Sequence, residues 1–489
     1  MTAAAALGTL LTLMFPVLLV LWLRAKDAAG KTTRVLVLVL GDIGRSPRTQ
    51  YHAISLAREG FEVHLAGYQG SPVLPEVLQA GDKITVHHIP NPMKLPVVRA
   101  GGVVGIAAYV GLAAFRVVRQ LVQLLMLCLR DVPAFGTILV QNPPAVPTLV
   151  IVQFLRLVVG CKVIIDWHNF GYSIMALNVG QRSRIVKLAE WYEKAFGNFA
   201  SAHLCVSKAM AAEMKTVWGV RGPIVTMYDK PPSHFRRLPL AEIHAFLSRY
   251  DLTTPIMRPT TSPTTTSQTL LTHLTPTGTL EPLTGRPALV VSSTSWTEDE
   301  DFEMLLEGLG LYEAAAGSKQ GGGDDQTVLP DIVLVITGKG PLKDMYLAKI
   351  KAKALKRVRV LTAWLPAEDY PLLLGSADLG ISLHTSSSGL DLPMKIVDMF
   401  GCGLPVCAVG YPCLEELVQD GVNGRVFGTP EELCGQLKSL LATPSTSSTK
   451  TTPHIPTPAL TSLRAGTKAF GRTRWHEEWV GVVEPLIVG

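Results

Sequence analysis

The most restrictive feature of this chain is a recurring pattern of short, continuous runs of Val, Ile and Leu with helical stretches between them. Strands with one solvated face alternate apolar and polar residues, whereas strands of a parallel sheet covered on both faces read as continuous apolar runs. The pattern therefore predicts an α/β chain with doubly wound parallel sheets. The expected strands are Val35–Leu40, Glu62–Ala66, Ile84–His88, Thr137–Val140, Lys162–Asp166, Ala202–Val206, Ala288–Ser293, Ile332–Thr337, Arg359–Leu361, Leu379–Leu383 and Val406–Ala408, with helices such as Thr49–Arg58 and Arg184–Phe196 between them.

Segments rich in Thr, Pro and Ser divide this pattern into two blocks. Such segments carry too little apolar surface to form a core. We therefore expect two Rossmann-like domains, with a ligand cleft between the carboxyl edges of their sheets. The expected organisation is an anchor and basic flank over 1–33, an N-terminal domain over 34–252, a linker or insertion over 253–286, a C-terminal domain over 287–442, a flexible segment over 443–462 and a C-terminal helix over 463–489.

The amino terminus carries an uncharged run of 21 residues, Ala3–Leu23, followed by Arg24 and Lys26. This length spans a hydrocarbon core of about 30 Å as a helix. Because the basic residues follow the run, the positive-inside rule places the amino terminus in the lumen and the rest of the chain in the cytosol. The alternative is a cleaved signal peptide, which would need a basic start and a small-residue cleavage site. The sequence predicts a single-pass anchor.

A second uncharged stretch, Ala100–Phe115, is short for a membrane span. One interpretation is a helix in the membrane interface, with the neighbouring arginines on lipid head groups. The other is a helix buried against the sheet, and the sequence leaves both open.

Charge and cysteine content narrow the function classes. A net charge of +6 and the absence of long basic runs with interleaved aromatics suit an anionic small ligand or a membrane surface, and argue against nucleic acid. The 7 cysteines form no CxxC pair, so the sequence predicts no metal site. None of the asparagines starts a glycosylation sequon, which agrees with a cytosolic location.

Polar residues follow two strands of the first block. After the first strand, Gly41, Asp42, Gly44 and Arg45 form a turn whose glycines let the backbone approach a phosphate or sugar, although the turn is not GxGxxG. After a later strand, Asp166, Trp167, His168 and Asn169 combine an aromatic ring with groups for hydrogen bonding and proton transfer. A capped turn with a satisfied histidine is the alternative.

The second block repeats the arrangement with a basic turn. Gly338, Lys339 and Gly340 end a strand and precede Pro341, so that free amides and an ammonium group can hold a diphosphate. Further along, Gly389 precedes an expected helix on which Asp391, Lys395 and Asp398 share one face. A surface ion pair would explain that spacing too, but charges on a sandwiched helix need partners, which a nucleotide sugar can supply.

Asp299–Asp301 is the one acidic run that resembles a metal motif. The spacing of Thr297 and Glu300 is that of a capping box, and we take the run as a charged helix start.

These motifs together resemble the GT-B glycosyltransferases, and within them the dolichol-pathway β-mannosyltransferases. The resemblance rests on Gly41–Arg48, Asp166–Asn169, Ser292–Thr297, Thr337–Pro341 and above all Leu379–Ala408, and covers nearly the whole chain after the anchor except the two Thr/Pro/Ser-rich segments.

The resemblance implies a function. It implies transfer of the first mannose from GDP-mannose, in β-1,4 linkage, to chitobiosyl-diphosphate-dolichol at the cytosolic face of the endoplasmic reticulum. Such transfer belongs to lipid-linked oligosaccharide assembly for N-glycosylation. Other dolichol-pathway mannosyltransferases are the implied partners, no tightly bound cofactor is required, and Mg²⁺ remains an option.

The resemblance also implies roles for residues. The diphosphate would lie on Lys339 with the amides of Gly338 and Gly340, Ser293 and Ser295 would line the same pocket, and Asp398 would bind the ribose hydroxyls. Asp391 lies one residue from the position of the earlier glutamate of retaining relatives. Since an α-linked donor and a β-linked product require one in-line displacement, a general base is needed. Asp42, Asp166 and His168 are the candidates.

Two other functions stay open at this level. One is a retaining α-glycosyltransferase of the same fold, and the other is a membrane-anchored binding protein that has lost catalysis.

Overall fold

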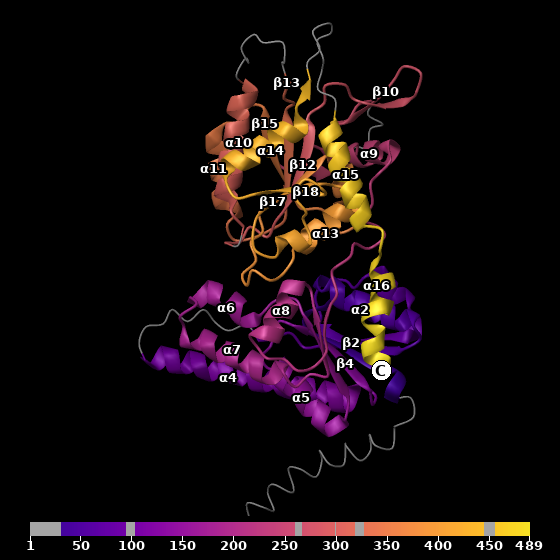
Figure 1. Ribbon diagram of the computed structural model, residues 1–489, viewed down its shortest axis with the longest axis vertical. Coiled ribbons are helices and arrows are strands. Elements are labelled where there is room, and N and C mark those ends of the chain that lie inside the picture. Colours follow the sequence, from indigo (N-terminus) through magenta and orange to yellow (C-terminus); the bar gives the residue numbers. More distant parts are fainter. Residues whose placement is uncertain (1–30, 94–102, 260–266, 299, 318–326, 445–454) are drawn as a thin grey trace, which may run out of the picture. The chain divides into compact units, whose positions relative to one another are not determined.

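The computed structural model describes residues 31–93, 103–259, 267–298, 300–317, 327–444 and 455–489. The chain divides into two compact units, Met1–Tyr228 with His476–Gly489, and Asp229–Trp475. Each unit is built around one parallel sheet with helices packed on it (Figure 1). The expected anchor, Ala3–Leu23, lies outside the described residues.

The first unit contains a seven-stranded sheet in the order β3-β2-β1-β4-β5-β6-β7, and its strands pair in parallel. The strands are β1 (Arg34–Asp42), β2 (Glu62–Tyr68), β3 (Ile84–Ile89), β4 (Thr137–Asn142), β5 (Lys162–Trp167), β6 (Ala202–Cys205) and β7 (Ile224–Thr226). Five successive residues of β1, Val35 to Val39, are at most 1% exposed, as a strand covered on both faces requires. This confirms the predicted doubly wound sheet.

Helices connect these strands and cover the sheet. They are α2 (Pro47–Arg58), α3 (Pro75–Gln79), α4 (Val103–Met126), α5 (Thr148–Val159), α6 (Gly171–Val179), α7 (Arg184–Gly197) and α8 (Lys208–Thr216), with short 3-10 turns at Lys31–Thr33, Ile43–Arg45 and Gly81–Lys83. Helix α2 packs on β1 and β2, whereas α6 packs on α7, α7 on α5, and α5 on α4 (Figure 1).

Helix α4 joins the two apolar stretches that the sequence shows around Arg116 and Arg119. It continues into a π-helical turn, Leu127–Asp131, so both stretches form one long element. The helix segment Gly111–Asp131 is long and apolar enough to cross a membrane by length and composition, and it is the one such helix among the described residues. Phe115 and Val122 are nevertheless exposed while Leu124 is buried, so α4 lies against the unit by one face.

The second unit contains a six-stranded parallel sheet in the order β15-β14-β12-β16-β17-β18. The strands are β12 (Ala288–Ser293), β14 (Ile332–Thr337), β15 (Val358–Ala363), β16 (Leu379–Ser382), β17 (Val406–Val409) and β18 (Gly424–Phe427). The edge strands β7 and β18 were not predicted. Strand β7 has only three residues, and the four residues of β18 include a glycine and an arginine, so neither shows a continuous apolar run.

The helices of the second unit are α9 (Leu240–Leu247), α10 (Phe302–Gly317), α11 (Lys343–Lys353), α12 (Asp369–Ser376), α13 (Met394–Gly401), α14 (Pro430–Leu441) and α15 (Pro458–Phe470), with a 3-10 turn at Leu414–Glu416. Small antiparallel pairs decorate it: β8 (Tyr250–Asp251) with β9 (Arg258–Pro259), β10 (Thr272–Leu274) with β11 (Leu280–Pro282), and β13 (Thr327–Val328) with β19 (Thr443–Pro444).

The boundary between the units falls at Tyr228/Asp229 and not at the expected residue 252. Helix α9 explains the difference, because its Ile243 and Phe246 belong to the hydrophobic core of the second sheet. The expected linker over 253–286 is also attached to that core through the buried Met257 and Leu271. Thr/Pro/Ser-rich composition thus conceals two apolar anchor points, while residues 260–266 lie outside the described part.

The chain's end differs from the expected single helix over 463–489. Helix α15 belongs to the second unit, while α17 (Glu484–Val488) and all but the first residue of α16 (Trp475–Val482) belong to the first. In the expected flexible segment over 443–462, the Thr457 hydroxyl accepts a hydrogen bond from the Leu460 amide and caps α15, and residues 445–454 are not described. Trp479 of α16 is fully buried in the first unit, where it reaches the functional site.

Candidate active site

The buried carboxylate of Asp166, near the end of β5, is the centre of the site in the first unit. Arg48 of α2 forms a bidentate ion pair with it, with Nε–Oδ2 and Nη2–Oδ1 distances of 2.8 and 2.9 Å. His52 and His168 approach the same Oδ2 with Nε2 at 3.2 and 3.1 Å. Burial opposes ionisation, but the charge of Arg48 and the two histidines hold the pKa of Asp166 well below its usual value.

This geometry separates the roles of the candidate bases. Asp166 is only 1% exposed and its carboxylate is bound by three side chains of its own unit, which argues against direct proton transfer from a substrate to Asp166. His168 has a side chain that is 20% exposed, and Asp166 holds its Nε2. A carboxylate that orients a histidine and stabilises its protonated form is the arrangement of a general base. Of the three candidate bases, His168 has the geometry that best fits this arrangement.

Arg48, His52 and Trp479 complete this network, and sequence reasoning assigned them no role. The Trp479 Nε1–H donates to His52 Nδ1 at 2.9 Å. Because Nδ1 accepts this bond, the proton of neutral His52 sits on Nε2 and donates to Asp166. Burial lowers the pKa of His52, which keeps it neutral. Arg48 and His52 are one turn apart on α2 and would have stood out as polar residues on its inward face.

The turn after β1 is held together by Asp42. Its carboxylate accepts hydrogen bonds from the Gly44 amide at 3.0 Å and from the Ser71 amide and hydroxyl at 2.9 and 3.0 Å. Burial raises the pKa of Asp42, but these hydrogen bonds outweigh it and the pKa lies below its usual value. A carboxylate stabilised in this way is a poor base, so the geometry argues against Asp42 in that role.

Gly41 and Gly44 of this turn differ in the space around them. A Cβ on Gly44 would lie 2.4 Å from the Ser71 carbonyl oxygen, so Gly44 allows two loops to pack together. Gly41 has space around it for a side chain. Arg45 is exposed and its Nε donates to the Ser71 hydroxyl at 3.2 Å. Arg45 is thus the cation that this turn offers to an anionic ligand.

Trp167 does not have the exposed ring face expected for sugar stacking. It is fully buried, packs edge-on against Trp218 at 5.2 Å between ring centroids, and donates from Nε1 to His203 Nδ1 at 3.1 Å. The expectation for Trp167 is corrected, because side chains in strands alternate and this one points into the core. Asn169 accepts from the Phe170 amide and the Ser173 hydroxyl and so supports the start of α6.

In the second unit, the glycine turn after β14 packs directly on the loop after β12. A Cβ on Gly338 would lie 1.8 Å from the Thr294 carbonyl oxygen, and one on Gly340 would lie 1.7 Å from that of Ser295. Lys339 is exposed, with its Nζ 3.9 Å from the ring centroid of Trp364. Helix α11 begins at Lys343, so Pro341 precedes the helix instead of opening it.

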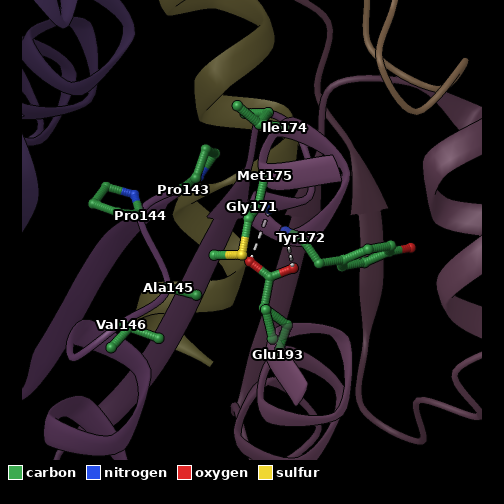
Figure 2. A pocket seen from close by; sticks show the side chains of 10 residues that line it. Pro143, Pro144, Ala145, Val146, Gly171, Tyr172, Ile174, Met175 and Glu193 are labelled. Atoms are coloured by element: carbon green, nitrogen blue, oxygen red, sulfur yellow. Dashed lines mark hydrogen bonds between the residues drawn. The ribbon is translucent and has the colours of Figure 1, made fainter. Parts of the chain in front are cut away.

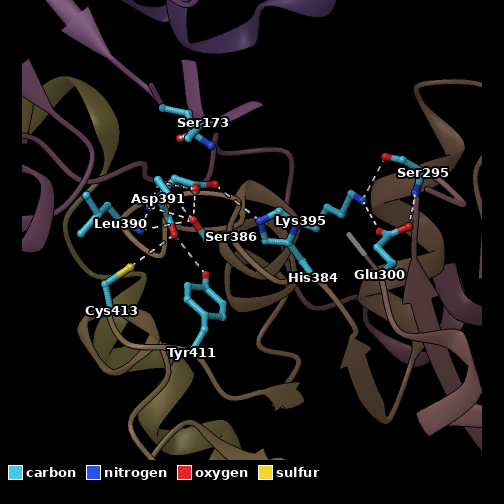
Figure 3. A network of polar contacts seen from close by, with 12 residues as sticks. Ser173, Ser295, Glu300, His384, Ser386, Leu390, Asp391, Lys395, Tyr411 and Cys413 are labelled. Carbon is cyan, nitrogen blue, oxygen red and sulfur yellow. Dashed lines mark hydrogen bonds and ion pairs between the residues drawn. The ribbon is translucent and has the colours of Figure 1, made fainter. Parts of the chain in front are cut away.

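Lys395 lies in a polar network with Glu300 and Ser295 (Figure 3). Its Nζ is 2.9 Å from Glu300 Oε1 and 3.3 Å from the Ser295 hydroxyl. Glu300 is buried and also accepts from the Ser295 amide at 2.9 Å and from the Thr294 hydroxyl. Because the Lys395 side chain is still 31% exposed, its ammonium group is positioned and available to an anion.

Glu300 is the residue of this network that the sequence analysis placed wrongly, at a helix start. The expected capping box with Thr297 does not form, since Asp301 accepts from the Met304 amide and caps α10. Glu300 instead points back to the loop after β12 and to Lys395. Asp299 lies outside the described residues, and in the described part no group of three His, Cys, Asp or Glu has metal-binding geometry.

Asp391 does not share a helix face with Lys395 as expected, whereas Lys395 and Asp398 are both on helix α13. Helix α13 begins at Met394, so Asp391 lies in the preceding loop. Its carboxylate accepts from the Ser386 hydroxyl and lies 3.4 Å from His384 Nε2, as Figure 3 shows. Gly389, with φ of 74°, provides the bend in this loop. Pro393 explains why the helix begins only at Met394, because a proline disfavours the helical conformation of the residue before it.

Asp398 of α13 is the second unusual carboxyl group. Burial and the nearby Asp229 carboxylate raise its pKa well above the usual value. The residues that the structure describes donate no hydrogen bond to this carboxyl. Nearby, the Tyr370 hydroxyl donates to Ser293 Oγ at 3.0 Å at the end of β12. An isolated carboxyl beside hydroxyl groups is suited to accept hydrogen bonds from a polyol ligand.

The family models and solved structures that this chain resembles are those of glycosyltransferases. A "Glycosyl transferase 4-like domain" model matches residues 44–228, and a "Glycosyl transferases group 1" model matches residues 319–443. The solved structures of Anabaena HepE with UDP and glucose and of Thermosynechococcus elongatus sucrose-phosphate synthase align with TM-scores of 0.55 and 0.58. Identities of 15% and 12%, over 92% and 93% of this chain and 98% and 96% of theirs, show that the GT-B fold is shared.

Curated relatives are much closer in sequence. The chitobiosyldiphosphodolichol beta-mannosyltransferase of Mus musculus is 45% identical over 99% of this chain and 95% of its own length. That of Homo sapiens is 42% identical over 100% of both chains. The Arabidopsis thaliana protein named UDP-glycosyltransferase TURAN is 43% identical over 94% of this chain and 98% of its own. With this identity over almost its full length, the chain is an enzyme with the GT-B fold and belongs to the chitobiosyldiphosphodolichol beta-mannosyltransferase family.

Proposed function

We propose that this enzyme transfers mannose from GDP-mannose, in β-1,4 linkage, to chitobiosyl-diphosphate-dolichol. The observation that carries the proposal is the Asp166–His168 pair at the carboxyl edge of the first sheet, with 3.1 Å between Oδ2 and Nε2. An inverting transferase needs such a base, because the acceptor hydroxyl must lose its proton as it attacks. The names of the relatives supply the substrate class.

The residues suggest how the reaction proceeds. The acceptor 4-hydroxyl attacks the anomeric carbon of the α-linked mannose from the face opposite the diphosphate, and its proton passes to His168. Asp166 stays ionised throughout and stabilises the imidazolium that forms. The C–O bond to GDP breaks in the same step, and the ammonium groups of Lys395 and Lys339 offset the charge on the departing diphosphate.

The donor-binding residues are those of the second unit. The Asp398 carboxyl would accept hydrogen bonds from the ribose hydroxyls, and Lys395 with the amides around Gly338 and Gly340 would hold the diphosphate. Asp391 would support this loop from its contacts with Ser386 and His384.

The proposed location is the endoplasmic reticulum membrane, with the amino terminus lumenal and both units cytosolic. Support comes from the uncharged run Ala3–Leu23 with basic residues after it, and from the exposed apolar face of α4. A lipid substrate passed between enzymes also favours proximity to other dolichol-pathway mannosyltransferases. Co-purification from mild detergent tests that association, and recovery of the isolated chain alone counts against it.

A UDP-sugar donor is the second candidate, because a relative with 43% identity is named a UDP-glycosyltransferase. Purified chain is incubated with chitobiosyl-diphosphate-lipid and equal concentrations of GDP-mannose, UDP-glucose or UDP-N-acetylglucosamine. We expect transfer from GDP-mannose, with a β-anomeric product by NMR. Transfer from a UDP-sugar alone would overturn the donor, and an α-linked product would identify a retaining enzyme.

Loss of catalysis in a decayed enzyme is tested in the same assay. Lys339→Ala and Asp398→Ala variants should transfer mannose more slowly than the parent chain. Undiminished transfer by both would refute the proposed donor site, and no transfer by the folded parent chain would favour a binding protein.

A further inference from the structure

A cavity of about 460 Å³ opens in the first unit between the loop after β4, helix α6 and helix α7 (Figure 2). This volume lies within the range of about 300–1,000 Å³ typical of small-ligand pockets. The cavity adjoins the carboxyl ends of β4 and β5, the edge that carries Asp166 and His168. The cavity belongs to the same unit as His168, the proposed base for the acceptor, whereas the proposed donor-binding residues belong to the second unit.

The lining of this cavity excludes a sugar or a phosphate. It consists of Pro143, Pro144, Ala145, Val146, Gly171, Tyr172, Ile174, Met175, Ala189 and Glu193. Of these side chains, only Tyr172 and Glu193 carry oxygen. A sugar needs several convergent polar groups, which this wall lacks, so the cavity selects an apolar ligand.

Glu193 lines the cavity, and its carboxyl group is bound by amide groups of the chain. Its carboxylate accepts from the Gly171 and Tyr172 amides at 2.8 and 3.4 Å, as Figure 2 shows, and from the Asn142 amide nitrogen at 3.4 Å. It therefore holds the start of α6. Burial raises the pKa of Glu193 to about 7, so a large fraction of this carboxyl is neutral near neutral pH.

Exposed apolar side chains occur at this cavity and on the two helices that form it. Val146 and Ile174, which line the cavity, are 42% and 38% exposed, and Leu177 of α6 and Leu188 of α7 are 55% and 63% exposed. Scattered exposed leucines are ordinary, but exposed apolar side chains at an apolar cavity mark a binding surface. Arg182, Arg184 and Lys187, which are also exposed, lie on the same α6–α7 segment.

This combination distinguishes between occupants. A second copy of the chain would bring the same basic residues to a two-fold interface, where like charges repel. A lipid with an anionic diphosphate head group and an apolar tail matches both the cations and the cavity. We propose that the cavity between the loop after β4, α6 and α7 binds the isoprenoid units next to the diphosphate of the acceptor lipid.

The proposal rests on the proposed function only for the identity of the lipid. It assigns the cavity a second task, to anchor the acceptor so that the sugar at the other end of the diphosphate reaches His168. Recognition of the lipid by its first apolar units then adds to any attraction between the enzyme and the membrane.

The first test compares two acceptors, chitobiosyl diphosphate carrying four isoprene units and the same compound carrying a methyl group. Ala189→Phe fills the cavity, and Ala212→Phe places the same side chain on the exposed surface of α8 as a matched control. We expect Ala189→Phe to lower the ratio of kcat/KM for the long over the short acceptor about tenfold, a typical change for an altered apolar pocket. Ala212→Phe should leave the ratio unchanged.

Equal losses on both acceptors with Ala189→Phe, or an unchanged ratio, would overturn the proposal. Conversion of a dimer into a monomer by Ala189→Phe, with an unchanged ratio, would assign the cavity to a second copy.

A second test is independent of catalysis. A tetraprenyl diphosphate with a photoreactive group on its first isoprene unit is irradiated with the full chain in detergent, and labelled peptides are identified by mass spectrometry. We expect labels in residues 143–147, 171–180 and 184–193, and their loss in Ala189→Phe. Labelling of other segments would overturn the proposal even if mannose is transferred, whereas labelling here without mannose transfer would overturn only the proposed function.

Discussion

Two carboxyl groups near the carboxyl edges of the two sheets, Asp166 and Asp398, are in opposite states. Asp166 has Arg48 and two histidines around it, and its pKa lies well below the usual value. Asp398 has another carboxylate, Asp229, nearby, and its pKa lies well above the usual value. Asp166 lies on strand β5 and Asp398 on helix α13, and the charges around the two carboxyl groups are opposite.

The difference shows that Asp166 already has charged and hydrogen-bonding partners within the chain, whereas Asp398 would gain them from a ligand. A buried charge is stable only when it is paired and hydrogen-bonded. Asp166 has these partners, so it acts through His168 as a positioning residue. Asp398 lacks them among the described residues, so a ligand with hydroxyl groups would complete its surroundings.

The largest effect is expected from His168, through which Asp166 would act on the substrate. His168→Ala removes the proposed base and should lower kcat about 10²–10⁴-fold, the usual contribution of general base catalysis. The melting temperature should change little, because the His168 side chain is partly exposed. The control is His88→Ala at an exposed position, with kcat and thermal unfolding measured for both. A kcat within a factor of two of the parent would remove His168 from the mechanism.

The next effect separates the two carboxyl groups by stability. Asp166→Ala leaves the Arg48 guanidinium buried without its counter-ion and should cost about 3–5 kcal/mol in the free energy of unfolding. Asp398→Ala removes a group that is costly to ionise and should cost much less. Denaturant unfolding of both variants measures this contrast. If the two losses are similar, the two groups are not in different states and the comparison fails.

Lys395 and Lys339, the two lysines of the proposed donor site, also differ in how their ammonium groups are held. Lys395 is held by the buried Glu300, whereas Lys339 rests on the exposed ring of Trp364. Lys395→Ala should therefore raise the KM for GDP-mannose about 10–100-fold, since a hydrogen bond to a charged group contributes about 1.5–3 kcal/mol. Lys339→Ala should raise it less. A larger effect at Lys339 would mean that the diphosphate lies on the glycine turn and not beside Glu300.

The opposite pKa shifts also predict opposite dependences of stability on pH. For Asp166, the ionised form is favoured in the folded state, so its stabilisation is present above a pH of about 4 and is lost as pH falls. For Asp398, the protonated form is favoured, so folding stability falls as pH rises from about 4 toward its raised pKa.

Asp398→Asn should therefore gain stability relative to the parent as pH rises, by at most about 1.4 kcal/mol per pH unit. The free energy of unfolding of both proteins between pH 4 and 8 gives this difference. A constant difference across that range would show that the Asp398 carboxyl is ionised throughout.

The features that could be predicted from the sequence are those set by residues close together in the chain. Continuous apolar runs gave the parallel strands, and the polar residues after them located His168, Lys395 and Asp398. The pKa of Asp166, which lies on strand β5, depends on Arg48 and His52 of helix α2. Glu300 was predicted to be part of a helix start, because its local spacing with Thr297 fits a capping box. Long-range side-chain contacts of this kind leave no periodic pattern in one sequence.

Helix α16, near the carboxyl terminus, allows the test with the smallest expected effect on the hydrogen-bond network around Asp166. Trp479 donates to His52, and His52 in turn donates to Asp166, so α16 helps to fix the ring whose proton faces the carboxylate. Trp479→Phe removes one buried hydrogen bond and should cost about 0.5–1.5 kcal/mol in the free energy of unfolding. In a double-mutant cycle with His52→Gln, the two losses should add to more than the loss of the double variant. Strict additivity would mean that helix α16 packs beside the network without orienting the His52 ring.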